Sequence, residues 1–147
     1  MQDLRERNLA AFFALLAGID GVSAASRNPD DPLEPAALPG LTQLDGGHRI
    51  IEAEHGDDMY AVDVDVEIFV GGANIAAAVT EMNLLWGRLV KTAFDNRDLG
   101  GLAQDVRHTG LSEPEPDRSE DVGPYVVAVA SFEIWFATAY GDPFTQP

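Results

Sequence analysis

Residues 59–70 read MYAVDVDVEIFV and give the clearest secondary-structure signal in the chain. Apolar side chains recur at every second position from Tyr60 onward, which is the period of a β-strand with two different faces. The residues between them include Asp63, Asp65 and Glu67. The stretch therefore predicts a long strand with one buried face and one largely acidic face.

Two amphipathic helices are predicted, one on each side of this strand. Residues 3–19 repeat apolar side chains at helical spacing, and residues 73–94 do so over six turns. The first stretch also suggests a cleaved signal peptide, because two arginines precede an apolar run, but Asp3 and Glu6 cancel their charge and favour the helix. The apolar stripe of the second helix consists of Ile75, Val79, Met82, Trp86, Leu89 and Ala93.

Further strands are expected on weaker patterns. Residues 41–44 and 48–54 would form a short hairpin, turned at Asp45-Gly46-Gly47. Residues 104–109 predict a strand with Val106 pointing inward, and residues 125–140 predict a long strand that is apolar on both faces in its first half. Prolines and acids predict mobile loops over about residues 23–40 and 112–122.

Together these elements indicate one α+β domain spanning residues 1–147. The expected architecture has two layers, a mainly antiparallel or mixed sheet with the two main helices on one face. The other face is then exposed or packed on a partner. Val127, Val129 and Trp135 lie on that side, and an apolar patch of this kind favours a partner interface.

The charge of the chain excludes several classes of protein. Its 147 residues hold 25 acidic and nine basic side chains, which gives a formal net charge of −16. A conventional nucleic-acid binder needs clustered Lys and Arg to neutralise phosphates, and this chain has a single lysine. The absence of cysteine removes disulfides, thiolate nucleophiles and cysteine metal sites.

A search for chemistry finds no complete motif for phosphate binding, dinucleotide binding, zinc proteolysis or serine hydrolysis. The acids Asp63, Asp65 and Glu67 suggest a hard-cation site or an acid–base pair, but a solvated sheet face explains them more simply. We therefore predict no catalytic residue, no cofactor and no bound metal. Near the expected hairpin, solvated turn residues are the simpler interpretation. The alternative is a mixed metal site that would use His48, Glu52, Glu54, His55, Asp57 and Asp58.

The whole pattern resembles the phage tail terminator proteins, also called tail-completion or minor tail U-like proteins, of long-tailed phages and gene transfer agents. The resemblance covers nearly the whole chain in element order. Its most specific pieces are the Leu-Gly-Gly-Leu-Ala turn at residues 99–103 and the Thr-x-x-Gly-Asp-Pro sequence at residues 138–143. The family has no catalytic motif to carry over.

This resemblance implies a structural role in the virion. Such proteins form a ring, typically a hexamer, at the head-proximal end of the tail tube, where the ring stops tube growth and joins neck or connector proteins. The expected partners are therefore further copies of the chain, the tube protein and the head–tail connector, with DNA passing through and no membrane. We expect Asp63, Asp65 and Glu67 to face the lumen and repel phosphates. The expected interfaces are Val127, Val129 and Trp135 on the last strand and Leu99, Gly100 and Gly101 in the turn.

Two other functions stay open at the level of sequence. One is another tail or neck component, such as a tube subunit or a connector. The other is a small acidic enzyme or ligand-binding α+β domain that uses the carboxylates.

Overall fold

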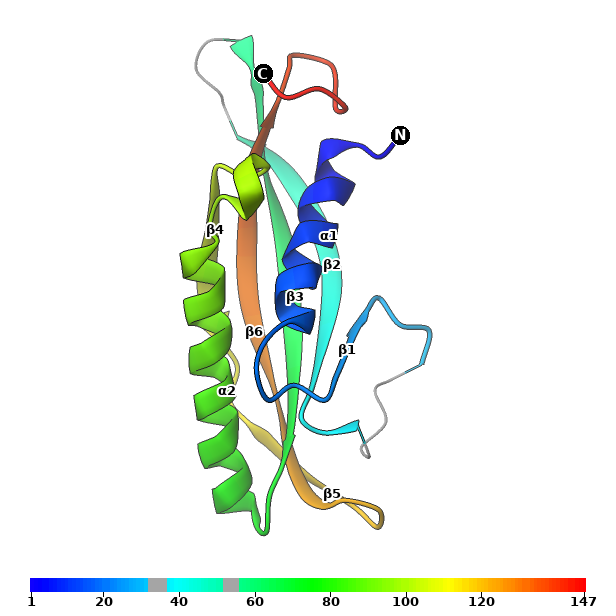
Figure 1. Ribbon diagram of the computed structural model, residues 1–147, viewed down its shortest axis with the longest axis vertical. Helices are drawn as coiled ribbons and strands as arrows, with labels where there is room; N and C mark the ends of the chain where they lie inside the picture. The colour runs from blue at the N-terminus through cyan, green and yellow to red at the C-terminus, as the bar shows by residue number, and fades with distance from the viewer. Residues whose placement is uncertain (32–36, 52–55) are drawn as a thin grey trace.

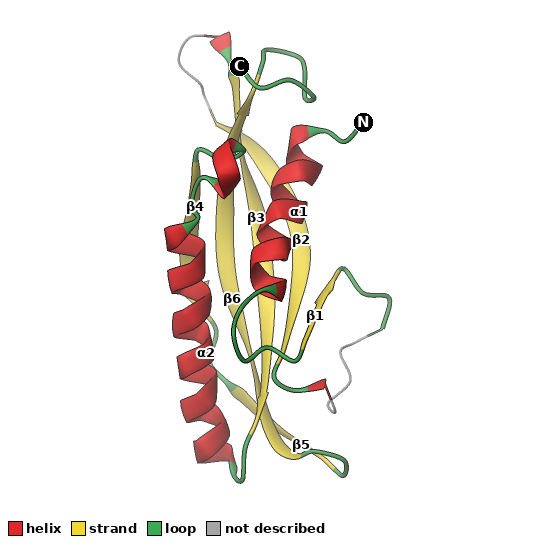
Figure 2. Ribbon diagram, viewed as in Figure 1, coloured by secondary structure: helices red, strands yellow, loops and turns green. Residues whose placement is uncertain are grey.

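The computed structural model of the chain describes residues 1–31, 37–51 and 56–147. Both helices lie on one face of a six-stranded sheet, so the fold is the two-layer α+β arrangement that the sequence predicts (Figures 1 and 2). The elements in chain order are α1 (Leu4–Ala17), β1 (Ala24–Arg27), β2 (Gly40–Ile51), β3 (Asp58–Gly71), α2 (Ile75–Asp95), the short 3-10 helix η3 (Leu99–Gly101), β4 (Asp105–Leu111), β5 (Glu115–Ser119) and β6 (Gly123–Thr138).

The sheet is mixed, with strand order β1-β2-β3-β6-β4 and with β5 also paired to β6. Only β1 and β2 run parallel, and every other described pair is antiparallel. The centre of the sheet is the β3–β6 pair, whose register runs from Asp58 opposite Thr138 to Gly71 opposite Tyr125. The predicted strands at residues 59–70, 104–109 and 125–140 are confirmed as β3, β4 and β6.

The core lies between this central pair and the two helices. The alternating apolar residues of β3 from Val62 to Val70 are buried, as is Val106 of β4. From α1, Phe12 packs on Phe132 of β6 with ring centroids 5.3 Å apart. Asp3 begins α1 by accepting a hydrogen bond from the backbone N–H of Glu6, as helix N-caps do. The predicted apolar stripe of the first helix is thus used for packing on the sheet.

The predicted hairpin at residues 41–54 is wrong in the part the structure describes. Residues 40–51 form one continuous strand, β2, and Glu52, Glu54 and His55 lie outside the described residues. The two glycines make a β-bulge instead of a turn, because the register slips by one residue between Asp45 and His48. A Cβ on Gly46 would lie 2.8 Å from the backbone oxygen of Asp63, so only glycine fits there.

Both predicted loops also contain strands. Within residues 23–40, β1 pairs with β2 from Ala24 to Arg27. Within residues 112–122, β5 pairs with the first five residues of β6. A strand at the edge of a sheet needs only backbone hydrogen bonds on one side, and it tolerates charged side chains and Pro116. The prediction of loops from composition is therefore wrong for the residues that form β1 and β5.

One arginine ties the edge of the sheet to the first helix. Arg27 of β1 forms a two-pronged ion pair with Glu6 of α1, with both N···O distances 2.8 Å. It also lies 2.7 Å from Asp45 of β2, which accepts hydrogen bonds from Asn28 and Gln43. Burial opposes ionisation of Asp45, but these hydrogen bonds outweigh it and lower its pKa. We call these five residues the Arg27 cluster.

Candidate functional site

The face of the sheet that looks away from α1 and α2 is the candidate site, and we call it the open face. On β3 it carries Asp63, Asp65, Glu67 and Phe69, which alternate with buried valine and isoleucine side chains. The register sets these residues beside Glu133, Ser131, Val129 and Val127 of β6, respectively. The structure therefore brings the predicted acidic residues and the predicted apolar patch onto one surface, although about 60 residues of sequence separate them.

The three predicted acids lie in three different surroundings. Asp63 is 63 % exposed, and its carboxylate lies 3.9 Å from Arg49 of β2. Asp65 accepts a hydrogen bond of 2.8 Å from the hydroxyl of Ser131. Glu67 is half-buried, and no hydrogen bond or ion pair to its carboxylate occurs among the described residues. The acids thus do not form a uniform line of free charges.

The most ordered part of the open face surrounds Glu133. Its carboxylate accepts a hydrogen bond of 3.0 Å from the indole of Trp135 and two of 3.2 Å from Arg49. The Trp135 bond and then Arg49 lower the pKa of Glu133. Arg49 therefore bridges two carboxylates, those of Asp63 and Glu133, which face each other across the β3–β6 pair.

A second arginine continues this arrangement onto β4. The guanidinium of Arg107 lies 4.0 Å from the ring centroid of Trp135, within the range of a cation–π contact. Arg107 also bonds Asp105, whose pKa is lowered chiefly by the hydrogen bond from Arg97. The Arg49–Glu133–Trp135–Arg107 group is thus held by contacts in series, and we call it the Arg–Trp row.

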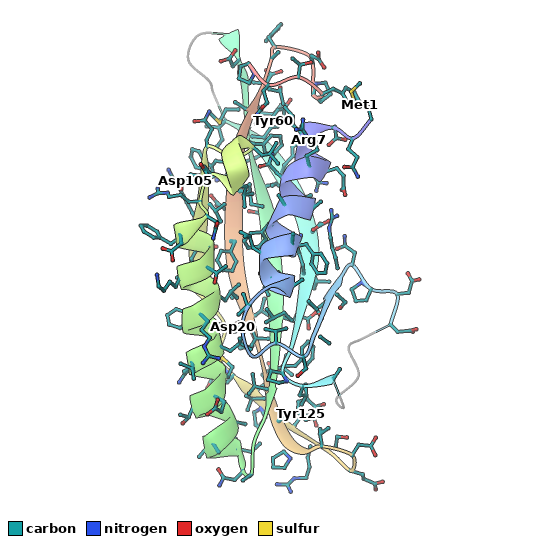
Figure 3. All side chains as sticks on the ribbon, viewed as in Figure 1. Met1, Arg7, Asp20, Tyr60, Asp105 and Tyr125 are labelled. Carbon is teal, nitrogen blue, oxygen red and sulfur yellow. The ribbon has the colours of Figure 1, made fainter. Side chains whose placement is uncertain are left out.

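The open face consequently differs from one end to the other. Tyr60 and Asp105 lie toward the end of the molecule where both termini lie, and Tyr125 lies toward the opposite end (Figure 3). Trp135 pairs with Asp105, so the Arg–Trp row belongs to the first end. Val127 is only two residues from Tyr125 on β6, so it belongs to the opposite end. The opposite end carries Glu67 with Val127 and Val129. Arg49 pairs the carboxylates of Asp63 and Glu133 at one end of the face, whereas the carboxylate of Glu67 toward the other end has no partner among the described residues.

The expected interface residues are exposed to different degrees. Val127, Val129 and Trp135 are each half-buried on the open face. In the η3 turn, Gly100 and Gly101 are exposed, whereas the side chain of Leu99 is only 6 % exposed and belongs to the core. The backbone of Gly101 accepts a hydrogen bond from Gln146 near the C-terminus. A partner at this turn could therefore meet the glycine backbone but not the leucine side chain.

No group of three or more metal-ligating side chains occurs in residues 1–31, 37–51 and 56–147. Of the residues in the alternative metal site, Asp58 accepts a hydrogen bond from the backbone N–H of Gly141, and His48 packs edge-on against Tyr60. Their neighbours Glu52, Glu54 and His55 lie outside the described residues. The paired carboxylates of the open face are held by arginines, which suits a fixed charged surface better than acid–base chemistry.

Sequence reasoning missed the Arg–Trp row. The sequence predicts Trp135 at an interface, but no local pattern links Arg49 to Glu133, because 84 positions of sequence separate them. The usable signal is that both arginines fall at outward positions of strands that also carry acids.

The described helices include none that is long and apolar enough to cross a membrane.

Comparisons with known proteins give little further information. No protein-family model matches the chain, and no curated protein matches it. Among solved structures, a chain of "Virion of native gene transfer agent (GTA) particle" is similar over 92 % of both chains, with 14 % sequence identity and a TM-score of 0.29. At this level of structural similarity, neither the fold nor the function of this chain follows from the match.

Proposed function

We propose that the protein is a structural component of a virion that forms a ring at the head-proximal end of a tail tube. In this role the ring ends tube polymerisation and offers the surface that joins tail to head. The observation that carries the proposal is the open face, a broad sheet surface with acidic and apolar side chains that no described element covers. The resemblance of the sequence to tail terminators suggests the use of this surface, as a wall of the ring and a contact between its subunits.

The open face suits a channel wall. Asp63 and Asp65 are exposed, and each copy of the chain brings a net charge of −16, so a ring that turned this face inward would repel DNA phosphates. Val127 and Val129 lie at the end of this face away from Asp63, and at that end a neighbouring copy or the tube would cover them. At the η3 turn, Gly100 and Gly101 present backbone only.

Assembly is the first test of the proposal. Native mass spectrometry and electron microscopy would be applied to the purified protein, alone and mixed with isolated tail tubes. We expect closed rings, in solution or on one end of the tubes. A protein that stays monomeric in both samples and binds a metal tightly would point instead to the ligand-binding alternative. Rings found along the whole tube would favour a tube subunit.

The channel wall is tested by charge removal in assembled particles. The triple variant Asp63→Asn, Asp65→Asn, Glu67→Gln should slow or stop DNA ejection while leaving ring assembly intact. A matched control changes the same net charge at the exposed Asp30, Asp31 and Glu113. Equal ejection rates for the triple variant and wild type would contradict a lumenal position of the acids.

A further inference from the structure

Two hydrogen bonds fix His108 of β4 between the helical layer and the sheet. Trp86 Nε1 of α2 lies 3.1 Å from His108 Nε2, and His108 Nδ1 lies 3.0 Å from the backbone oxygen of Ser131 on β6. The imidazole also packs on Phe132, with ring centroids 4.9 Å apart. Trp86, expected in the core, is half-buried at the margin of the core, and its indole N–H donates to His108.

These partners leave His108 one protonation state that satisfies both of them. An indole N–H can only donate, so His108 Nε2 must accept with its lone pair. A backbone carbonyl can only accept, so Nδ1 must carry the proton. A second proton on Nε2 would set two N–H groups against each other. The neutral ring makes both hydrogen bonds, whereas the charged ring keeps only the bond to Ser131.

The surroundings of the ring offer the charged form no replacement partner among the described residues. The rings in contact with it belong to Trp86 and Phe132, and neither titrates. None of the charged side chains on the three packed elements has a described hydrogen bond or ion pair to His108. Those side chains are Glu81, Arg88, Lys91 and Asp95 of α2, Asp105 and Arg107 of β4, and Glu133 of β6.

The strand that carries His108 lies at the edge of the sheet, where Val106 in the core and Arg107 on Trp135 also hold it. In the described residues β4 pairs along one side only, with β6. Its register slips between His108 and Gly110, so the ladder is interrupted next to the histidine. His108 itself is half-buried. A change at this side chain therefore acts beside an interruption of the backbone ladder at the edge of the sheet.

We propose that Trp86 and His108 form a pH-sensitive latch that holds edge strand β4 against α2 when His108 is neutral and releases it when His108 is protonated. Histidine is the side chain that ordinarily changes charge between about pH 5 and pH 8. The latch is a property of the single folded chain. It is therefore independent of the proposed ring, and either can fail without the other.

Indole fluorescence tests the latch directly. The chain has two tryptophans, so Trp135→Phe leaves Trp86 as the only indole. On acidification from about pH 8 to pH 5 the emission of Trp86 should change in a single titration. Adding His108→Gln should abolish the change, because glutamine can accept from Trp86 and donate to Ser131 without titrating. His48→Gln is the matched control, and it should keep the wild-type titration.

Hydrogen exchange of residues 105–111 supplies the structural readout. At the lower pH, amides of β4 should exchange about 2- to 10-fold faster in wild type than in the His108→Gln variant, as expected for one lost hydrogen bond. At the higher pH the two proteins should match. Trp86→Phe, which removes the donor, should show the faster exchange at both pH values. A fluorescence titration that persists in His108→Gln, or equal exchange in both proteins at low pH, would overturn the latch.

Discussion

The two faces of the central β3–β6 pair share one backbone ladder but carry very different side chains. On the helix side, every residue from Val62 to Val70 in alternate positions is buried at 2 % exposure or less. On the open face, Asp63 is 63 % exposed and Phe69 is half-buried. One set of strands therefore supplies stability on one side and a charged surface on the other.

The contrast indicates that one face of the sheet supplies most of the free energy of unfolding, whereas the other is available for binding. Burial of apolar area stabilises the fold, so substitutions on the helix side should act through stability. Exposed ion pairs contribute little to stability, so the open face is free to vary in charge.

The largest effect is expected from a buried aromatic ring. Phe132→Ala should lower the free energy of unfolding by about 3–5 kcal/mol, because it leaves a cavity beside Phe12. Phe69→Ala on the open face is the matched change, and we expect it to cost less than half as much. Urea unfolding of both variants measures the difference. Equal losses would mean that the open face is covered within one chain.

The Arg27 cluster should come next. Arg27→Met should destabilise the protein by about 1–3 kcal/mol, a value reduced because Glu6 keeps 37 % exposure and water screens the pair. Arg49→Met on the open face is the matched variant, and its cost should be under about 1 kcal/mol. A larger loss for Arg49→Met would reverse the proposed division between the faces.

The same cluster predicts a pH dependence whose sign follows from its carboxylates. The hydrogen bond from Arg27 lowers the pKa of Glu6, and hydrogen bonds lower that of Asp45. Their contribution is present above the unfolded-state values of about 4 and is lost as pH falls through the lowered folded-state values. Unfolding measured from pH 7 downward should therefore show a steeper loss in wild type than in Arg27→Met. Parallel curves would exclude the cluster as the cause.

The smallest effect on stability should come from the acids of the open face. Changing Asp63, Asp65 and Glu67 to their amides should move the free energy of unfolding by no more than about 0.5 kcal/mol in either direction. The reason is that a distant arginine and one hydroxyl are the only described partners. Denaturation at low and high salt checks this result. A strong, salt-independent loss would show a structural role for these carboxylates.

Much of the fold could be predicted because its main helices and strands have clear patterns of apolar residues in the local sequence. The alternation in residues 59–70 and the helical stripe of residues 73–94 predicted β3 and α2 to within two residues at each end. The errors fall where local chemistry and tertiary pairing disagree. Gly46 and Gly47 have the composition of a turn, but pairing with β3 extends the strand through them as a bulge. The acidic stretch around Pro116 has the composition of a loop, but β6 offers it a backbone ladder.

Side-chain periodicity depends only on neighbours along the chain. It was therefore enough to predict the two-layer architecture and a sheet face that carries both acidic and apolar side chains. Which side chains meet across the sheet could not be predicted from the sequence. Arg49 reaches Glu133 across 84 positions of sequence, Arg107 stacks on Trp135, and Trp86 finds His108. Such contacts depend on strand order and register, and these are set by the packing of the whole sheet against its helices rather than by any local pattern.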